Sequence, residues 1–210
     1  MKKISILLSG LIVLCLMSCS KITGIKGNGN VVTEHRNYSS ISKIKSNGSF
    51  DVYIIKDSVN SVVVEAEENL LPYIETKVKD GELVIKSKNR SHLKNTEPIK
   101  IYLNSRSVSS VSLAGSGYVK IENIDNSFLD LKLSGSGNID CDANVNTLEA
   151  DISGSGKILL TGIAEEADFH ISGSGSIKSY NLEQERCFVH ISGSGEIYAT
   201  VSELLDVKIS

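Results

Sequence analysis

Apolar and polar residues alternate along the C-terminal half of this chain, from residue 106 to residue 210. A two-residue period indicates β-strands with one buried face, because successive side chains of a strand point to opposite sides. The alternation is interrupted five times by a Gly-Ser-Gly triplet, at intervals of 20, 19, 19 and 20 residues. We therefore expect each repeat to form a strand, a tight corner, a second strand and a return turn. The triplets occupy residues 115–117, 135–137, 154–156, 173–175 and 193–195.

Equivalent positions of the repeats are apolar, which predicts that the repeats stack. One repeat cannot bury its own apolar face, but stacked repeats bury a continuous core with successive rungs ~4.8 Å apart. The predicted fold is all-β, a parallel β-helix or β-solenoid with rungs of 19–20 residues. The expected inward columns are Val111, Leu131, Ala150, Phe169 and Val189; Leu113, Leu133, Ile152, Ile171 and Ile191; Val119, Ile139, Ile158, Ile177 and Ile197; and, in the return turns, Ile124, Val145, Ile163, Leu182 and Val201.

The glycines of the triplets are expected to be structural. A corner that joins two strands within three residues needs positive φ or a close backbone approach, and both favour glycine. A phosphate-binding loop would require a helix N-terminus after the glycines, whereas each triplet precedes another strand. We assign this corner role to Gly115, Gly117, Gly135, Gly137, Gly154, Gly156, Gly173, Gly175, Gly193 and Gly195.

Residues 31–105 carry the strand pattern with less regular spacing. An Asp-Gly pair at residues 80–81, between two alternating segments, predicts a hairpin with a two-residue turn. A single helical turn is expected near Pro72, and the Asn-Gly-Ser sequence at residues 47–49 resembles a degenerate corner. Two interpretations stay open for this part, an imperfect start of the solenoid or a separate cap, because terminal units of solenoids usually differ from the inner ones.

The first 30 residues have the pattern of an export and anchoring segment. Two lysines precede an apolar run over residues 4–17, which is shorter than a membrane span. The sequence Leu-Met-Ser-Cys at residues 16–19 resembles the bacterial lipobox, in which the cysteine is acylated. We predict a signal peptide over residues 1–18, lipid attachment at Cys19 and a polar tether over residues 19–30. The alternative is an ordinary secretory peptide that is cut nearby.

Composition limits the classes of partner. The chain has 210 residues, a formal net charge of −3 and 40% hydrophobic residues, which fits one domain. The sequence has no cluster of basic residues beyond its N-terminus, which argues against nucleic acid as a partner. Aromatic residues are only 5% of the chain and tryptophan is absent, which weakens the case for a stacking platform. We expect no disulfide, because Cys141 and Cys187 fall in different columns two repeats apart.

Outward positions of the repeats align as the inward ones do, and they place Asp151, His170 and His190 on adjacent rungs. Two imidazoles and a carboxylate at this spacing could ligate a divalent metal. An open sheet face offers no enclosure and no supporting second shell, however, so solvated side chains are the expected state. We predict no metal and no other cofactor.

A second outward column, with Asp130, Glu149 and Asp168, is interpreted as a solubilising face. The Gly-Gly-x-Gly-x-Asp turns of calcium-binding β-rolls are absent from the sequence. Catalysis has little support, because the repeat turns are too short to form the walls of a cleft. The pairs Asp130 with Asp151 and His92 with Glu97 do not stand out from scattered surface charge. The sequence also lacks a nucleophile elbow, a Walker loop and a zinc motif.

Three stretches together make the chain resemble the auto-transporter adhesin head GIN domain family, a group of bacterial exported proteins. They are Ser-Asn-Gly-Ser-Phe-Asp-Val-Tyr at residues 46–53, Glu-Asn-Leu-Leu-Pro-Tyr-Ile-Glu-Thr-Lys-Val-Lys-Asp-Gly-Glu-Leu-Val-Ile at residues 68–85, and the repeated Ile-Ser-Gly-Ser-Gly-x-Ile core. The resemblance covers about residues 30–210. It implies a β-solenoid carried on the cell envelope, and it supplies no catalytic residues.

These observations predict a non-enzymatic, lipid-anchored envelope protein that acts as an adhesin or scaffold. The expected partners are the membrane, through the anchor, and a glycan or protein surface; a homo-oligomer could form through an unpaired terminal strand. The expected location is the outer membrane, with a periplasmic or secreted protein as alternatives. Two other functions stay open: a polysaccharide-acting enzyme or accessory protein with its site in residues 57–104, and a structural protein without a ligand.

Overall fold

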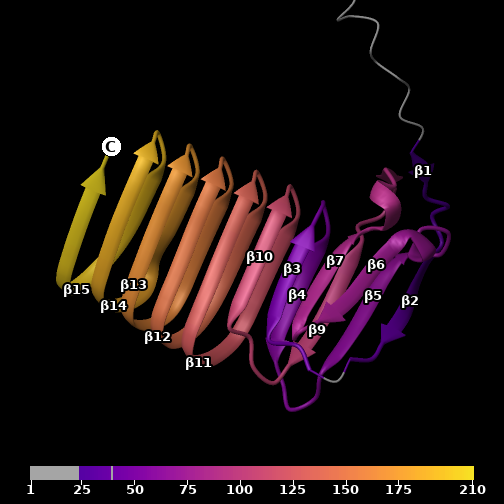
Figure 1. Ribbon diagram of the computed structural model, residues 1–210, viewed down its shortest axis with the longest axis horizontal. Helices are drawn as coiled ribbons and strands as arrows, with labels where there is room; N and C mark the ends of the chain where they lie inside the picture. The colour runs from indigo at the N-terminus through magenta and orange to yellow at the C-terminus, as the bar shows by residue number, and fades with distance from the viewer. Residues whose placement is uncertain (1–23, 39) are drawn as a thin grey trace, which may run out of the picture.

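The computed structural model describes residues 24–38 and 40–210, which form a β-solenoid of about five turns with a less regular N-terminal part (Figure 1). Strands make up 74% of the described residues, as the repeat pattern predicted. The predicted signal peptide and Cys19 lie outside the described residues. Within the described residues, no helix is long and apolar enough to cross a membrane.

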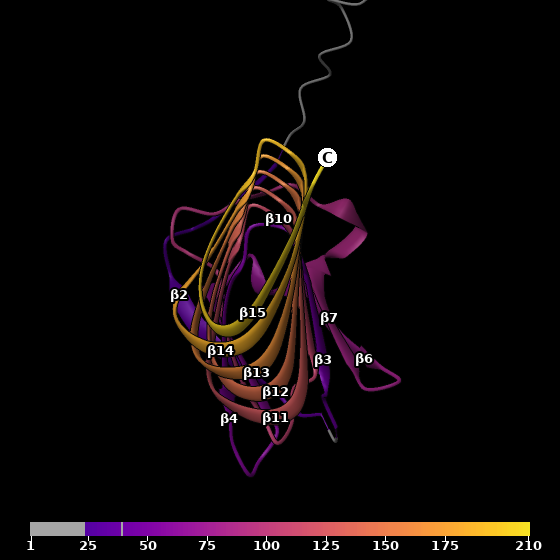
Figure 2. The ribbon, with the colours of Figure 1, turned by 90° about the vertical axis from the view of Figure 1, so that its left-hand side faces the viewer.

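The repeats form six strands that pair in parallel along the solenoid axis. Viewed along that axis, they form nested, elongated loops (Figure 2), because β11 to β14 each run through a return turn from one side of the solenoid to the other. We call the side formed by residues 110–114, 130–134, 149–153, 168–172 and 188–192 face A; these strand residues precede the triplets in the sequence. Face B is the side formed by the strand residues that follow the triplets. The strands are β10 (Ser110–Gly115), β11 (Tyr118–Gly135), β12 (Asn138–Gly154), β13 (Lys157–Gly173), β14 (Ser176–Gly193) and β15 (Glu196–Ile209).

The predicted columns of apolar residues form the core. Leu133, Ile152 and Ile171 are paired in register and are 1%, 2% and 1% exposed. Their side chains are buried between the two faces, where stacked aliphatic groups stabilise each rung by removing apolar surface from water. The prediction that residues 19 or 20 apart are neighbours on adjacent rungs is therefore confirmed.

The prediction for the return turn of the third repeat was wrong. Ile163 is 50% exposed, and Ala164 takes the buried position. The two repeats that precede the triplets at 154 and 173 are both 19 residues long, so their return turns stay in register and Val145 pairs with Ala164. Ile163 then falls on the alternate, outward side of the strand.

Each corner brings two backbones so close that only glycine fits. Gly154 has a φ of +132°, and a Cβ on it would lie 2.5 Å from the carbonyl oxygen of Gly135 on the neighbouring rung. A Cβ on Gly156 would lie 2.5 Å from the carbonyl oxygen of Gly137. The exposed serine between the glycines contributes its backbone, since the N–H of Ser155 donates to the Gly135 carbonyl at 2.9 Å. The triplets thus have a steric explanation that requires no ligand.

The irregular part begins with a complete rung. β3 (Lys43–Asn47) and β4 (Asp51–Lys56) flank Gly48, whose φ is +138°, and they pair in parallel with β10 and β11. The next rung outward consists of β7 (Glu82–Ser87) and β9 (Lys100–Ser105), paired in parallel with β3 and β4. Residues 88–99, with η2 (Lys88–Arg90) and β8 (Leu93–Lys94), replace its corner. Residues 43–56 and 82–105 are therefore an imperfect start of the solenoid.

The antiparallel strands β2, β5 and β6 close the N-terminal end of the stack, and we call them the cap. β5 (Ser61–Glu67) pairs with β9 and with β2 (Val31–Arg36), while β6 (Ile74–Lys79) pairs with β7. η1 (Leu71–Tyr73) connects β5 to β6 and contains the predicted helical turn. Asp80 and Gly81 both have positive φ, 51° and 77°, as the predicted hairpin turn requires.

Two side chains cover part of the outer edge of β6. The Arg36 guanidinium donates to the Ile74 carbonyl at 2.9 Å and to the Thr76 hydroxyl at 2.8 Å. The Tyr38 hydroxyl donates to the Thr76 carbonyl at 2.9 Å. Bonded edge groups cannot pair with another strand, so these contacts protect the end of the sheet from edge-to-edge association.

The described part of the predicted tether, residues 24–30, is bound to the cap. β1 (Ile25–Lys26) pairs with β8, and the Glu67 carboxylate holds the next residues. Glu67 is fully buried and accepts hydrogen bonds from the N–H of Gly29 at 2.7 Å and from the N–H and hydroxyl of Thr96 at 2.8 and 2.7 Å. The Thr96 hydroxyl and the backbone donors lower the pKa of Glu67 to about 2, against the opposing effect of burial.

Glu67→Gln is expected to lower the free energy of unfolding at pH 7 and to reduce the further loss of stability when the pH is lowered. An ordinary glutamate has a pKa of 4.5, so the contribution of the ionised Glu67 is complete above about pH 4.5 and is lost as the pH falls toward 2. Thermal melts of the wild type and the variant at pH 7 and pH 3 measure this difference. The two proteins should differ more at pH 7 than at pH 3; an equal difference at both would contradict the role of the charge.

Cys141 and Cys187 are free and buried, as expected from their separate columns. Burial raises the pKa of the Cys187 thiol to about 11. Both thiols are therefore protonated, unreactive parts of the core.

Candidate functional site

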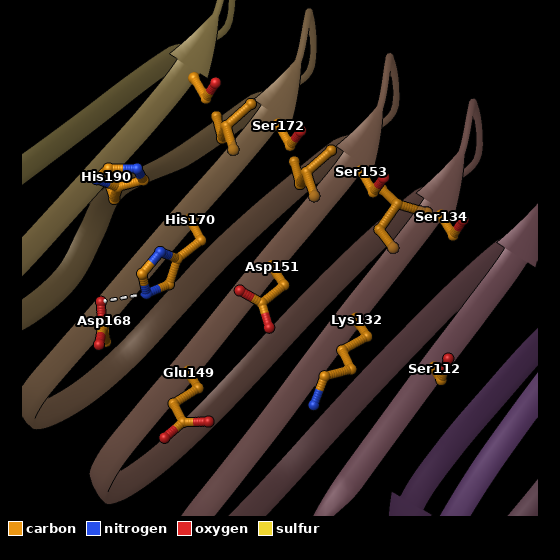
Figure 3. A pocket seen from close by; sticks show the side chains of 14 residues that line it. Ser112, Lys132, Ser134, Glu149, Asp151, Ser153, Asp168, His170, Ser172 and His190 are labelled. Atoms are coloured by element: carbon orange, nitrogen blue, oxygen red, sulfur yellow. Dashed lines mark ion pairs between the residues drawn. The ribbon is translucent and has the colours of Figure 1, made fainter. Parts of the chain in front are cut away.

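Face A carries a shallow groove of about 750 Å³ that crosses several rungs (Figure 3). Three columns of outward-facing residues line it. Each column occupies one outward position of the strands, and neighbouring columns are two residues apart in the sequence. Leu133, Ile152 and Ile171 also border it. The serine column is Ser134, Ser153, Ser172 and Ser192; the central column is Ser112, Lys132, Asp151, His170 and His190; and the acidic column is Glu149 and Asp168.

The parallel register places these residues side by side. Asp151 pairs with His170, and His170 pairs with His190, so the three lie on adjacent rungs as the sequence predicted. Lys132 occupies the same position one rung before Asp151. Because every rung repeats the same strand position, the groove runs across the strands, parallel to the solenoid axis.

Two close side-chain contacts organise the titratable groups in and beside the groove. His170 Nε2 lies 2.9 Å from Asp168 Oδ1, and Lys132 Nζ lies 2.7 Å from Oδ2 of Asp130, which does not line the groove. Partial burial raises the pKa of Asp151, and the nearby His170 and Lys132 oppose this shift. Among the described residues, Asp151 forms neither an ion pair nor a hydrogen bond, so its charge is only partly compensated.

The register brings Asp151, His170 and His190 to adjacent rungs without gathering their side chains around one point. Among residues 24–38 and 40–210, no group of three or more His, Cys, Asp or Glu side chains is arranged to hold a metal ion. The imidazole rings of His170 and His190 have centroids 5.9 Å apart and planes tilted by 48°, and His170 turns toward Asp168 (Figure 3). Backbone register places these residues on adjacent rungs, but the one side-chain contact with a carboxylate is that of His170 with Asp168.

Two members of the other pairs considered for acid–base chemistry, Asp130 and His92, make structural contacts. Asp130 accepts a hydrogen bond from the Ser110 hydroxyl at 3.0 Å in addition to its contact with Lys132. The carbonyl of His92 accepts the N–H of Ile25 at 2.8 Å. The loop that contains His92 and Glu97 is therefore part of the contact between residues 24–30 and the cap.

These features define a β-solenoid with an open, polar groove in place of an enclosed pocket. The chain belongs to the family described as "Putative auto-transporter adhesin, head GIN domain", whose model matches residues 40–210. Membership of an adhesin-like family indicates an exported or cell-surface protein.

Solved structures from Bacteroides and Parabacteroides species have the same architecture. A "putative adhesin" from Bacteroides fragilis is 25% identical, with a TM-score of 0.84 over 89% of this chain and 87% of that chain. A "putative lipid binding protein" from Parabacteroides distasonis is 24% identical, with a TM-score of 0.66 over 89% and 98% of the two chains. A "putative adhesin" from Parabacteroides merdae is 22% identical, with a TM-score of 0.65 over 89% and 97%. The last two show the fold alone. No curated protein matches the chain.

Proposed function

We propose that this is a non-enzymatic, adhesin-like protein of the cell envelope that binds an extended ligand along the groove of face A. The observation that carries the proposal is the groove itself, in which serine, imidazole and carboxylate groups recur in register on successive rungs. A repeated surface of this kind suits a repeated ligand, because each rung offers similar contacts to each unit of a polymer. Affinity would then come from many weak polar contacts.

The sheet geometry supports binding through side chains. The strands that carry the groove are bonded to neighbours on both sides, so their backbone N–H and C=O groups are already engaged. The polar groups that remain for a ligand on this face are the hydroxyl, imidazole, ammonium and carboxylate groups of side chains. Hydroxyls both donate and accept hydrogen bonds, which suits a ligand with many polar groups.

A substitution that fills the groove is expected to reduce binding at least about tenfold, equivalent to ~1.4 kcal/mol. Ser153→Phe places a large ring at the middle of the serine column, where the native side chain is exposed. The same change at Asn138, an exposed outward position of face B, serves as the control. Binding of the soluble domain, from Ser20 onward, to a glycan and host-matrix array measures the effect.

Unchanged binding by Ser153→Phe, or equal loss in Asn138→Phe, would contradict the groove as the site. A hydrolase screen with the same glycans is run alongside the array. Product release that requires this domain would contradict the non-enzymatic part of the proposal and favour a polysaccharide-acting protein.

We also propose that a lipid on Cys19 anchors the protein, and Ser20 after it is compatible with the outer membrane. Cys19→Ala is expected to move the protein from the membrane fraction to the soluble fraction, because acylation at the lipobox cysteine provides the attachment. Cys15→Ala is the matched control and should stay at the membrane, since Cys15 leaves with the signal peptide. Cys19→Ala protein that stays with membranes through a carbonate wash would refute acylation at this residue.

A further inference from the structure

The groove on face A has an excess of negative charge. Glu149, Asp151 and Asp168 face it, and Lys132 is the one Lys or Arg among its lining residues. The Lys132 ammonium is 2.7 Å from Asp130, a carboxylate outside the groove, so its charge is shared between that carboxylate and those of the groove. Asp168 contacts His170, whereas Glu149 and Asp151 have no ion-pair partner within the described part of the chain.

The groove is also rich in hydroxyl groups, and no Phe, Tyr or Trp side chain is among its lining residues. Four serines of one column line it at successive rungs. A peptide usually binds a sheet by adding a strand to an edge or by placing apolar side chains in pockets. Strand addition is excluded on face A, because its strands are paired on both sides where the groove lies. The apolar residues that border the groove, Leu133, Ile152 and Ile171, are at most 2% exposed. A hydroxyl-bearing chain fits this surface better than a peptide.

The spacing of the rungs points to the same kind of ligand. Equivalent groups on neighbouring rungs are ~4.8 Å apart. This distance is close to the length that one pyranose unit adds to a β-1,4-linked chain. A glycan that lies along the solenoid axis can therefore present one sugar unit to each rung.

We infer that the groove binds an oligosaccharide that carries free amino groups, with its ammonium groups against Glu149 and Asp151 and its hydroxyls along the serine column. This inference rests on the proposed function and names its ligand class. Coulomb attraction from two carboxylates without ion-pair partners favours a cationic sugar over its neutral form and disfavours a uronic acid chain. Partial burial strengthens the attraction at Asp151, because screening by water is weaker there.

The test compares three probes with the intact soluble domain at about pH 7, where an amine with the ordinary pKa of an α-amino group, about 7.7, is largely protonated. The probes are a β-1,4-linked glucosamine oligomer, the fully N-acetylated form of the same oligomer, and a uronic acid oligomer of similar length. The deacetylated oligomer is expected to bind about tenfold more tightly than the acetylated one, and the uronic acid chain most weakly. Raising the salt concentration should reduce the difference, since salt screens exposed charges.

Three variants test which carboxylates cause the preference for the deacetylated oligomer. Asp151→Asn and Glu149→Gln are each expected to reduce binding of the deacetylated oligomer about fivefold, equivalent to ~1 kcal/mol for one partly exposed ion pair, and to leave the acetylated oligomer unchanged. Asp142→Asn removes an exposed carboxylate from face B and should have no effect on either probe. All three positions are on the surface, and a thermal melt confirms that each variant is folded.

Several outcomes would overturn the inference. Equal binding of the two forms of the oligomer would refute the role of charge, while the effect of Ser153→Phe would still support a groove that binds polymers. Tighter binding of a lysine-rich peptide than of any sugar probe would refute the glycan. Loss of the preference in Asp142→Asn would show that the charges of face B, and not those of the groove, select the ligand.

Discussion

Ile171→Asp is expected to abolish the cooperative unfolding transition of the domain. Ile171 is 1% exposed and lies in the column between Ile152 and Ile191. A lone carboxylate at this position would lose its hydration without gaining a partner, at a cost of several kcal/mol. Because whole domains are stable by only about 5–15 kcal/mol, one such substitution removes a large part of the total. Differential scanning calorimetry or a circular dichroism melt measures the result.

Ser172→Asp is the matched control, since Ser172 is the next residue, is exposed and points to the outer side of face A. It should melt within a few degrees of the wild type, as surface substitutions usually do. If Ile171→Asp also kept a cooperative transition near the wild-type temperature, the inward orientation of this column would be contradicted.

Gly154→Ala is expected to destabilise the domain by about 3 kcal/mol, through backbone strain and crowding at one corner. The new Cβ would meet the Gly135 carbonyl oxygen at 2.5 Å, and alanine disfavours a φ of +132°. In a protein of this size the change corresponds to a fall in melting temperature of about 6–12 °C. Ser155→Ala, at the exposed centre of the same triplet, should have little effect. A melting temperature of Gly154→Ala equal to that of Ser155→Ala would show that the corner tolerates a side chain.

The stacked part of the fold could be predicted because its signal is local and repeated. The triplets fix the interval between rungs, and alternation fixes which side chains point inward, so the pairing of Asp151 with His170 followed from counting residues. Ile163 shows the limit of this approach. Two adjacent apolar positions, Ile163 and Ala164, were available, and the choice between them depends on the exact length of the return turn.

The order of the N-terminal rungs could not be predicted. The rung formed by residues 43–56 lies between the rung formed by residues 82–105 and the strands β10 and β11. Along the sequence, the inner rung therefore comes before the outer rung, and strands β5 and β6 of the cap come between them. Nothing local in the sequence specifies such long-range parallel pairing. The role of Glu67 was missed for the same reason, because its partners Gly29 and Thr96 are 38 and 29 residues away in the sequence.

At the candidate site, the sequence predicted which residues are neighbours but not what their side chains contact. The His170 side chain contacts Asp168, two residues earlier on the same strand, and does not join Asp151 and His190 around a common point, as metal binding would require. The groove was not predicted, because its depth depends on side-chain rotamers and on the small size of the serines beside the corners. A column of four serines next to mixed charges was the available signal.

The central claim, that face A binds the ligand, is tested most directly by nuclear magnetic resonance of the labelled soluble domain during titration with the glucosamine oligomer. We predict that shifted backbone amide signals concentrate at residues 132–134, 149–153, 168–172 and 190–192, on adjacent rungs of one face. Signals from face B, including Asp142 and Lys178, should stay in place. Shifts confined to face B, to the loop at residues 88–99 or to the β6–β7 hairpin would contradict the claim.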